Sequence, residues 1–347
     1  MGDRDEPPPR DVIAAEIAAN GPMRLDRFIA LANALYYGGR DPLGRAGDFV
    51  TAPEMTQAYG ELLGAWAVEV WRGQGAPVPI VLAEAGPGRG TLMADALRLI
   101  DRLAPDFAAA SVVHLVETSP TLRAEQAARL GGRVVAWHEQ LATLPDGPAL
   151  LVASEFLDVL PVRQFRRRNG LWVERAVALA GGRFVWTDLP AEPPEDGAGE
   201  VSPAARAWMA EATRRVVRYG GAALVVDYGH DGGAEDTLQA VRAHRPVDPL
   251  EAPGAADLTA HVDFGALARA ARAEGGEVYG PVPQGEFLRR LGLPERTAVL
   301  CRNAPPTVAR NLQAAARRLM DPDAMGLLFK AMAVLPPGVA PPPGFEP

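Results

Sequence analysis

Short apolar runs alternate with segments of helical periodicity over the middle of the chain. The apolar runs lie near residues 80–84, 111–116, 133–136, 149–154 and 222–227, and the helical patterns lie between them, near 91–103, 119–130 and 203–218. Short apolar strands that alternate with helices are typical of a parallel sheet covered by helices on both faces. The pattern therefore predicts an α/β fold with a doubly wound sheet.

The flanking segments follow other patterns. Residues 162–188 alternate apolar and polar positions around two short glycine-containing turns, which predicts an antiparallel β excursion after the fourth strand. Residues 11–37 predict two short helices, and Pro53 begins a further helix that extends to about Trp71. The rest of the chain predicts a closing strand pair and helices near 262–274, 285–291 and 306–319. We expect the proline-rich end to be disordered.

Composition excludes several classes of protein. The 347 residues carry a formal net charge of −8, which argues against nucleic acid as a partner. Cys301 is the single cysteine and the histidines show no ligand spacing, so we expect neither a disulfide nor a metal. No run of 18 apolar residues occurs, and the acidic start resembles neither a signal peptide nor a mitochondrial presequence. We therefore predict a soluble bacterial cytoplasmic protein with no membrane insertion.

A glycine turn follows the first strand and carries the clearest chemistry. Glu84 ends the strand, and Gly86, Gly88 and Gly90 follow at alternate positions. Ligands of doubly wound sheets bind at the carboxyl ends of the strands, and glycine allows a ligand to approach the backbone. A dinucleotide motif has another glycine spacing, and a phosphate loop needs a lysine that is absent here. A plain glycine loop is the alternative to a ligand site.

The charge of Glu84 distinguishes between the remaining candidate ligands. A carboxylate at this turn repels a pyrophosphate but suits a cation, which favours S-adenosylmethionine with its sulfonium and amino groups. The second strand also ends in an acid, Glu117, which is suited to accept hydrogen bonds from the two ribose hydroxyls of that cofactor. Glu84, the three glycines and Glu117 are therefore candidate cofactor residues.

Eight segments resemble the MidA-like proteins, the bacterial relatives of a mitochondrial complex I assembly-factor methyltransferase. They lie between about residues 25 and 330, at 47–66, 84–98, 115–126, 154–165, 224–229, 236–264, 280–292 and 325–330. Ala85 departs from the family, in which we expect a bulkier apolar residue. The resemblance implies a Rossmann-like class I methyltransferase, with activity on a protein arginine in the mitochondrial relatives. It also implies a protein partner such as a subunit of respiratory complex I.

The resemblance further implies a domain plan and more cofactor contacts. Residues 1–75 would form a helical cover and cofactor lid, and residues 76–335 the methyltransferase domain. Insertions would lie at about 160–200 and 284–322, and residues 336–347 would form the disordered tail. The additional candidate cofactor contacts are Thr51, Glu54, Glu61 and Thr118.

Acids after the fourth strand suit methyl transfer to a guanidinium, whose pKa lies above about 12. Glu155 ends that strand and Asp158 follows one helical turn later, so both are candidates to orient the guanidinium and take up its charge. Loop polarity and capping are the alternative. His261 is a candidate proton acceptor or a structural histidine, and Asp263 is either catalytic or the cap of the next helix.

The acceptor and the oligomeric state stay open at this stage. A protein arginine is the leading hypothesis, and a nitrogen or oxygen of a small molecule is the rival that keeps the fold. A non-catalytic assembly factor that only binds the cofactor is a third hypothesis. A nicotinamide dehydrogenase is disfavoured by Glu84 and by the glycine spacing, and a homodimer is compatible with the sequence.

Overall fold

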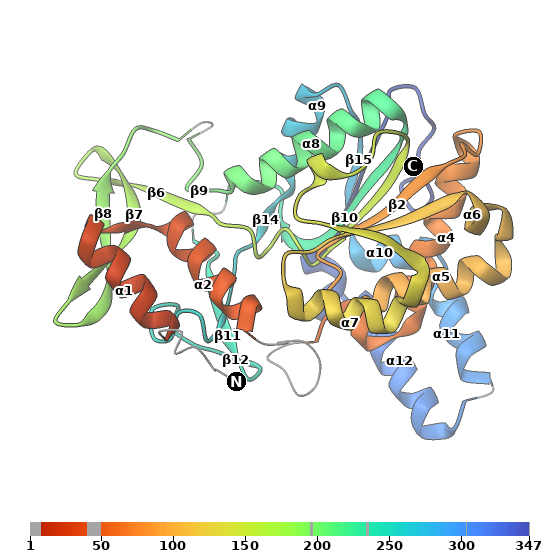
Figure 1. Ribbon diagram of the computed structural model, residues 1–347, viewed down its shortest axis with the longest axis horizontal. Helices are drawn as coiled ribbons and strands as arrows, with labels where there is room; N and C mark the ends of the chain where they lie inside the picture. The colour runs from red at the N-terminus through yellow and green to blue at the C-terminus, as the bar shows by residue number, and fades with distance from the viewer. Residues whose placement is uncertain (1–7, 40–49, 195–196, 234–235, 303, 347) are drawn as a thin grey trace. The chain divides into compact units, whose positions relative to one another are not determined.

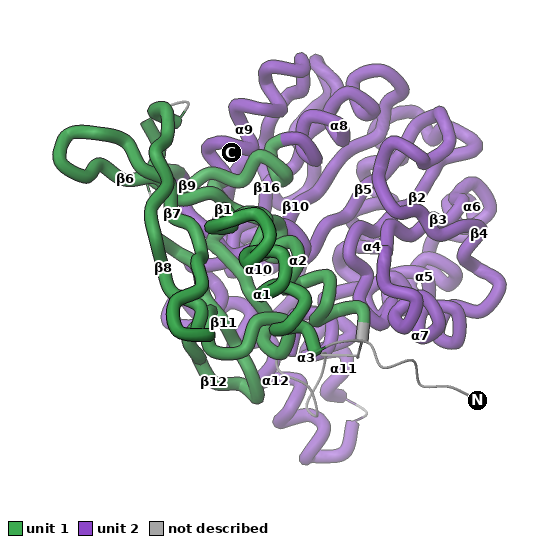
Figure 2. Tube along the Cα trace, turned by 60° about the vertical axis from the view of Figure 1, so that its left-hand side comes forward, with its two compact units in different colours: residues 1–49, 158–206, 232–263 green, residues 50–157, 207–231, 264–347 purple. Residues whose placement is uncertain are grey.

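The computed structural model describes residues 8–39, 50–194, 197–233, 236–302 and 304–346, and the chain forms two compact units (Figures 1 and 2). One unit comprises residues 1–49, 158–206 and 232–263, and the other comprises residues 50–157, 207–231 and 264–347. The expected boundary at residue 75 therefore differs from the structure. The N-terminal helices share a core with the β insertion, whereas residues 50–75 pack with the large sheet.

The larger unit, shown in purple in Figure 2, is built on a sheet of strand order β15-β16-β10-β5-β2-β3-β4. These strands are β2 (Ile80–Ala85), β3 (Ser111–Val116), β4 (Val134–His138), β5 (Ala149–Ser154), β10 (Gly221–His230), β15 (Glu277–Pro283) and β16 (Phe329–Leu335). Strands β4, β3, β2, β5 and β10 are parallel, and β16 is antiparallel to both β10 and β15. This confirms the predicted parallel sheet and closing strand pair. The strand order reverses beside β2, which is where ligands of such sheets bind.

Helices cover both faces of this sheet (Figure 1). On one face lie α4 (Gln57–Gly73), α5 (Thr91–Leu103) and α7 (Pro120–Leu130), and on the other lie α8 (Pro203–Tyr219) and α9 (Phe264–Ala273). The short α6 (Pro105–Ala110) leads from α5 to β3. Gly60 brings α4 close to α5, because a Cβ at this position would lie 2.7 Å from the carbonyl oxygen of Leu92. None of the helices in the described part of the chain is long and apolar enough to cross a membrane.

Two segments of this unit differ from the expectation. The helix predicted from Pro53 is broken into α3 (Ala52–Met55) and α4, because Thr56 between them adopts an extended backbone and accepts a hydrogen bond from the Ala58 N–H at 3.3 Å. The insertion at 284–322 contains α10 (Gln284–Arg290), α11 (Leu293–Arg302) and α12 (Pro306–Met320). The sequence pattern did not predict α11. The short turn η4 (Pro322–Gly326) connects α12 to the last strand.

The C-terminal segment is packed, contrary to the expected disorder. Phe345 is buried and its ring lies 5.1 Å from that of Phe287 in α10. The Tyr279 hydroxyl donates a hydrogen bond to the carbonyl oxygen of Val339 at 2.5 Å. An aromatic ring and a backbone carbonyl therefore anchor the proline-rich segment, which proline content alone could not indicate.

The smaller unit combines α1 (Pro9–Asn20) and α2 (Leu25–Gly39) with an antiparallel sheet. That sheet contains β1 (Met23–Arg24), β6 (Arg163–Arg168), β7 (Leu171–Ala180), β8 (Arg183–Pro190) and β9 (Glu200–Val201). The predicted hairpin turns are present, and Asn169-Gly170 and Gly181-Gly182 have positive φ at both central residues, as tight hairpins require. A second small sheet holds β11 (Gln239–Arg242), β12 (Arg245–Pro246) and β13 (Asp257–Thr259), and β14 (Val262–Asp263) follows.

Candidate active site

The glycine turn lies at the carboxyl end of β2, with all three glycines in the left-handed region. The φ angles are 64° at Gly86, 52° at Gly88 and 75° at Gly90. A Cβ on Gly86 would lie 2.5 Å from the Phe156 ring, and one on Gly90 would lie 3.2 Å from Leu130. The backbone conformation and the close packing both require glycine here. The turn therefore presents bare backbone at the point where the strand order reverses.

Glu84 lies buried beneath this turn with an unsatisfied oxygen. The residue is 3% exposed, and no group in the described part of the chain hydrogen-bonds to its Oε2 atom. Burial raises the pKa of Glu84 to about 8, the Met93 backbone N–H opposes this rise, and the charge of Glu117 adds to it. An orphaned buried carboxyl is costly without a donor or a cation. The site therefore fits a ligand that brings a positive charge to Glu84.

Glu117 directly follows β3, the strand next to β2, and its carboxylate is held by several hydrogen bonds. Oε1 accepts hydrogen bonds from the backbone N–H groups of Thr118 and Ser119, both at 2.8 Å, and Oε2 accepts one from Gln126 at 3.2 Å. Burial raises the pKa of Glu117, and these hydrogen bonds act in the opposite direction. Thr118 contributes its backbone here, while its side chain is exposed.

Glu155 directly follows β5 and has an unusual backbone conformation. Its φ of 52° lies in the left-handed region, which a non-glycine residue adopts only at a cost of roughly 1–2 kcal/mol. Its Oε1 atom accepts a hydrogen bond of 2.6 Å from the backbone N–H of Ala52, the first residue of α3. The N-terminal segment of this unit is thus attached directly to the candidate catalytic carboxylate.

Asp227 holds the turn that carries Glu155. This fully buried residue of β10 accepts hydrogen bonds from the backbone N–H groups of Phe156 and Leu157 at 3.1 and 2.9 Å, and from that of Tyr228 at 2.9 Å. Asp227 was not among the candidate site residues expected from the sequence. The signal was a carboxylate inside an otherwise apolar strand, which needs partners to be buried.

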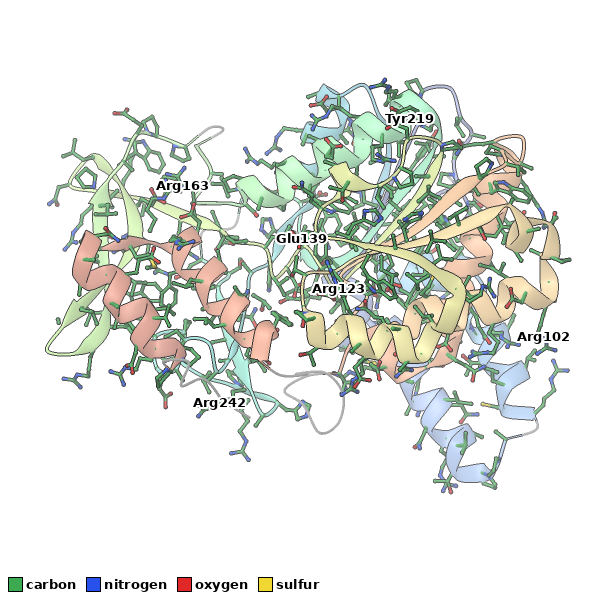
Figure 3. The ribbon with its side chains drawn as sticks, viewed as in Figure 1. Arg102, Arg123, Glu139, Arg163, Tyr219 and Arg242 are labelled. Carbon is green, nitrogen blue, oxygen red and sulfur yellow. The ribbon has the colours of Figure 1, made fainter. Side chains whose placement is uncertain are left out.

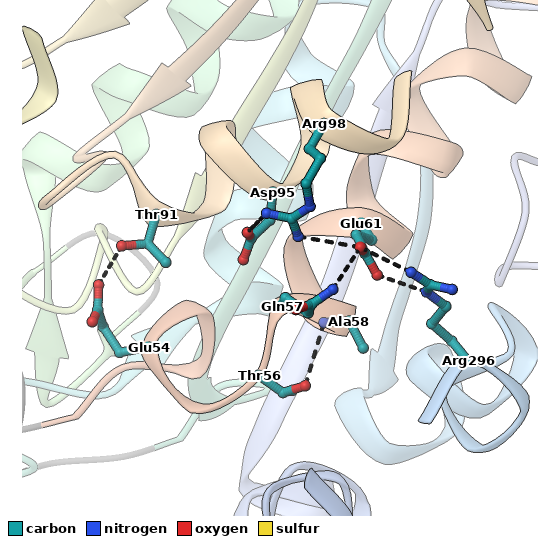
Figure 4. A network of polar contacts seen from close by, with 9 residues as sticks. All are labelled: Glu54, Thr56, Gln57, Ala58, Glu61, Thr91, Asp95, Arg98 and Arg296. Atoms are coloured by element: carbon teal, nitrogen blue, oxygen red, sulfur yellow. Dashed lines mark hydrogen bonds and ion pairs between the residues drawn. The ribbon is translucent and has the colours of Figure 1, made fainter. Parts of the chain in front are cut away.

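Glu54 of α3 and Glu61 of α4 have two different environments (Figure 4). Glu54 accepts a hydrogen bond from the Thr91 hydroxyl and lies 3.9 Å from the Arg89 guanidinium, beside the glycine turn. Glu61 instead forms a bidentate pair with Arg296 of α11, at 2.7 and 3.0 Å, and a bond of 3.2 Å to Arg98. The pKa of Glu61 is lowered because these ion pairs outweigh its burial. A structural role fits Glu61 better than the cofactor contact predicted for it.

The remaining candidates are divided between the two units. Thr51 precedes α3 as its N-cap residue, is partly buried and makes no side-chain cap bond. Asp158, His261 and Asp263 belong to the smaller unit. There Asp158 accepts a hydrogen bond from the Ala260 N–H through its backbone oxygen, and the backbone N–H of His261 donates to Thr237 at 2.8 Å. Residues 44–49 of the expected cofactor lid lie outside the described residues.

The buried acid beneath a glycine turn, the second acid at the next strand end and the strand order together define a class I S-adenosylmethionine-dependent methyltransferase. The chain belongs to this family, since residues 62–282 match the family model of S-adenosyl-L-methionine-dependent methyltransferases. Its cofactor is S-adenosyl-L-methionine.

Two kinds of relative extend this assignment. A crystal structure of a COG1565 superfamily member and likely methyl transferase from Burkholderia thailandensis, bound to S-adenosyl-homocysteine, has a TM-score of 0.81 and 27% identity, and covers 97% of this chain and 93% of that one. The chain is 35% identical to the mitochondrial protein arginine methyltransferase NDUFAF7 of Xenopus tropicalis, over 92% of this chain and 84% of that protein. The human NDUFAF7 is 35% identical over 92% of this chain and 82% of its own length.

These relatives correct one prediction. A bacterial cytoplasmic location was expected from the acidic start of the chain and from the resemblance. The Xenopus tropicalis, Drosophila melanogaster and human proteins at 35% identity are mitochondrial proteins of eukaryotes, which contradicts that expectation. The composition of one short segment does not determine where a protein resides in the cell.

Proposed function

We propose that this methyltransferase modifies an arginine side chain of a protein, with Glu155 as the residue that receives the guanidinium. The observation that carries the proposal is the left-handed φ of 52° at Glu155, at the carboxyl end of β5. Strained non-glycine residues cluster at functional sites. An ionised carboxylate can accept several hydrogen bonds at once, and the one from the backbone N–H of Ala52 is among those at Glu155. The names of the mitochondrial relatives support the choice of arginine.

We assign the cofactor contacts as follows. Glu84 would receive the amino group of S-adenosylmethionine, because its buried carboxyl has an unsatisfied oxygen. Glu117 would accept hydrogen bonds from the two ribose hydroxyls. The backbone of Gly86, Gly88 and Gly90 would lie against the cofactor. When bound, S-adenosylmethionine supplies a methyl group on a positively charged sulfonium. Glu54 would lie near the cofactor because it contacts Thr91 at the end of the glycine turn.

The chain's own contribution to the reaction is orientation and charge. A guanidinium is planar and positively charged, and a carboxylate binds its fork through two parallel hydrogen bonds. Glu155 would fix the nitrogen that becomes methylated, and Asp227 would keep Glu155 in place through the adjacent backbone amides. The nitrogen must lose a proton, and Asp158, His261 and Asp263 remain candidate acceptors together with Glu155. A complex I subunit as the protein acceptor, and a homodimer, also remain proposals.

The test uses methyl-tritiated S-adenosylmethionine, the purified protein and a lysate of cells that lack the gene. A labelled protein band that yields methylarginine on hydrolysis supports the proposal. The Glu155→Gln variant should bind S-adenosylhomocysteine normally and lose most of this labelling, whereas Glu69→Gln, an exposed change on the same unit, should keep both. Label found only in small molecules, or on a residue other than arginine, would overturn the proposed acceptor.

A further inference from the structure

Gln126 of α7 links three parts of the cofactor end of the sheet. The residue is fully buried. Its Nε2 atom donates a hydrogen bond to the backbone oxygen of Gly88 at 2.7 Å and one to Oε2 of Glu117 at 3.2 Å. Its Oε1 atom accepts a hydrogen bond from Nε1 of Trp137 on β4 at 2.7 Å. One amide group therefore joins the glycine turn, the acid at the end of β3 and the next strand.

The indole of Trp137 fixes the direction of this amide. An indole N–H can only donate, so the oxygen of the Gln126 amide must face it. The two amide hydrogens are then directed to Gly88 and Glu117. Each donor and acceptor of the group has a partner, which a buried amide requires. An ionised glutamate can only accept hydrogen bonds, and methionine has no hydrogen-bond donor. Neither residue can therefore reproduce the two donated bonds and the one accepted bond of Gln126.

A second residue of the same helix holds the backbone of Glu117. This residue is Arg123, near the start of α7 (Figure 3). Its Nε atom donates a hydrogen bond to the Glu117 carbonyl oxygen at 2.8 Å, and its Nη2 atom contacts the same oxygen. Arg123 and Gln126 are three residues apart, so they lie on one face of α7. Arg123 fixes the main chain of Glu117 and Gln126 fixes its carboxylate. Neither residue was singled out in the sequence.

We propose that Gln126 is a positioning residue, which sets the Glu117 carboxylate and the Gly88 carbonyl in the arrangement that receives the ribose of S-adenosylmethionine. This inference rests on the proposed role of Glu117 at the ribose. Gln126 acts through Glu117 and is not itself a contact to the reacting atoms. Its loss would leave a buried carboxylate with one fewer donor and would release the middle of the glycine turn.

The test is calorimetric binding of two probes, S-adenosylhomocysteine and its 2′-deoxy analogue, to the full chain. Gln126→Met should weaken the binding of S-adenosylhomocysteine by roughly tenfold to a hundredfold, which is the range for losing a hydrogen bond to a charged group. It should weaken the deoxy analogue less, because that probe lacks a hydroxyl that Glu117 would hold. A variant that merely folds poorly would lose both probes equally.

Two further variants make the result decisive. Gln284→Met changes another fully buried glutamine of the same unit, which donates to the Leu319 carbonyl at 2.9 Å, and it should leave the affinity of both probes unchanged. At pH 8, Gln126→Glu should bind S-adenosylhomocysteine more weakly than Gln126→Met does. At pH 5.5 its affinity should come closer to that of wild type, because a protonated carboxyl regains one hydrogen-bond donor. These results would hold even if the methylated acceptor proved not to be arginine.

The outcomes also separate this inference from the proposed function. Equal affinity of wild type and Gln126→Met for S-adenosylhomocysteine, with normal thermal unfolding, would overturn the positioning role while leaving protein labelling untouched. An equal loss of affinity for the two probes, in a Gln126→Met protein with normal thermal unfolding, would overturn the proposal that Gln126 acts through the ribose contact.

Discussion

Glu84 lies near the end of β2 and Glu117 directly follows the neighbouring parallel strand β3, and burial together with the charge of Glu117 raises the pKa of Glu84 to about 8. Two acids side by side are costly in a buried site unless one is protonated or a cation lies between them. The protein without ligand therefore holds Glu84 largely protonated at neutral pH. A ligand with a positive amino group would favour the ionised form and release the proton.

Cofactor affinity should consequently rise with pH. Between pH 6 and about 8 each unit should strengthen S-adenosylmethionine binding by up to about tenfold, and the affinity should level off above the pKa of Glu84. Calorimetry in buffers of different ionisation enthalpy measures the released proton directly. Glu84→Gln should bind weakly at every pH and release none. A wild-type affinity that does not change between pH 6 and 8 would contradict the assignment of Glu84.

The Glu84 carboxyl should also destabilise the ligand-free protein at high pH. Between the ordinary value of 4.5 and about 8, the folded chain keeps a proton at Glu84 that the unfolded chain has lost. The folded state then binds more protons, so the contribution of this group to stability falls as pH rises. Glu84→Gln should therefore unfold at a higher temperature than wild type at pH 8, with the difference shrinking toward pH 5. Thermal unfolding without ligand at both pH values checks the sign.

Gly86 should not tolerate even one additional carbon. Gly86→Ala would place a Cβ 2.5 Å from the Phe156 ring at a φ of 64°, so the turn must move. We expect a loss of about 1–3 kcal/mol in the free energy of unfolding, and weaker S-adenosylhomocysteine binding. The matched control is Gly132→Ala, where no atom lies within 4 Å of the added carbon. Similar behaviour of the two variants in denaturant unfolding and calorimetry would count against the close packing of this turn.

Substitution of Glu61 should affect stability, whereas substitution of Glu54 should affect cofactor binding. Glu61→Gln removes the charge that pairs with Arg98 and Arg296, and should lower the free energy of unfolding by about 1–3 kcal/mol without changing cofactor affinity. Glu54→Gln should do the reverse, because Glu54 is more exposed and contacts Thr91 beside the glycine turn. Unfolding in urea and binding of S-adenosylhomocysteine are measured for both. A large loss of affinity in Glu61→Gln would restore it as a cofactor contact.

The sequence by itself determined the sheet, the glycine turn and the identity of the cofactor. Buried parallel strands are continuous apolar runs, so β2, β3, β5 and β10 could be read from the chain directly. The glycines and Glu84 can be recognised in the sequence itself. Glycine indicates a turn with positive φ, and a carboxylate near the end of an apolar run indicates a polar strand end, without reference to any distant partner. The hairpin turns at Asn169-Gly170 and Gly181-Gly182 were predictable for the same reason.

Only the tertiary structure decided which partners each of these acids has. Glu54 and Glu61 are both glutamates and lie seven residues apart, yet Arg296, which is distant along the chain, pairs with Glu61. Gln126 gained its role from Gly88, Glu117 and Trp137, which lie on three other segments. The packing of Phe345 on Phe287 likewise ordered a segment whose composition predicted disorder. Such partners are brought together by folding, so a local pattern cannot reveal them.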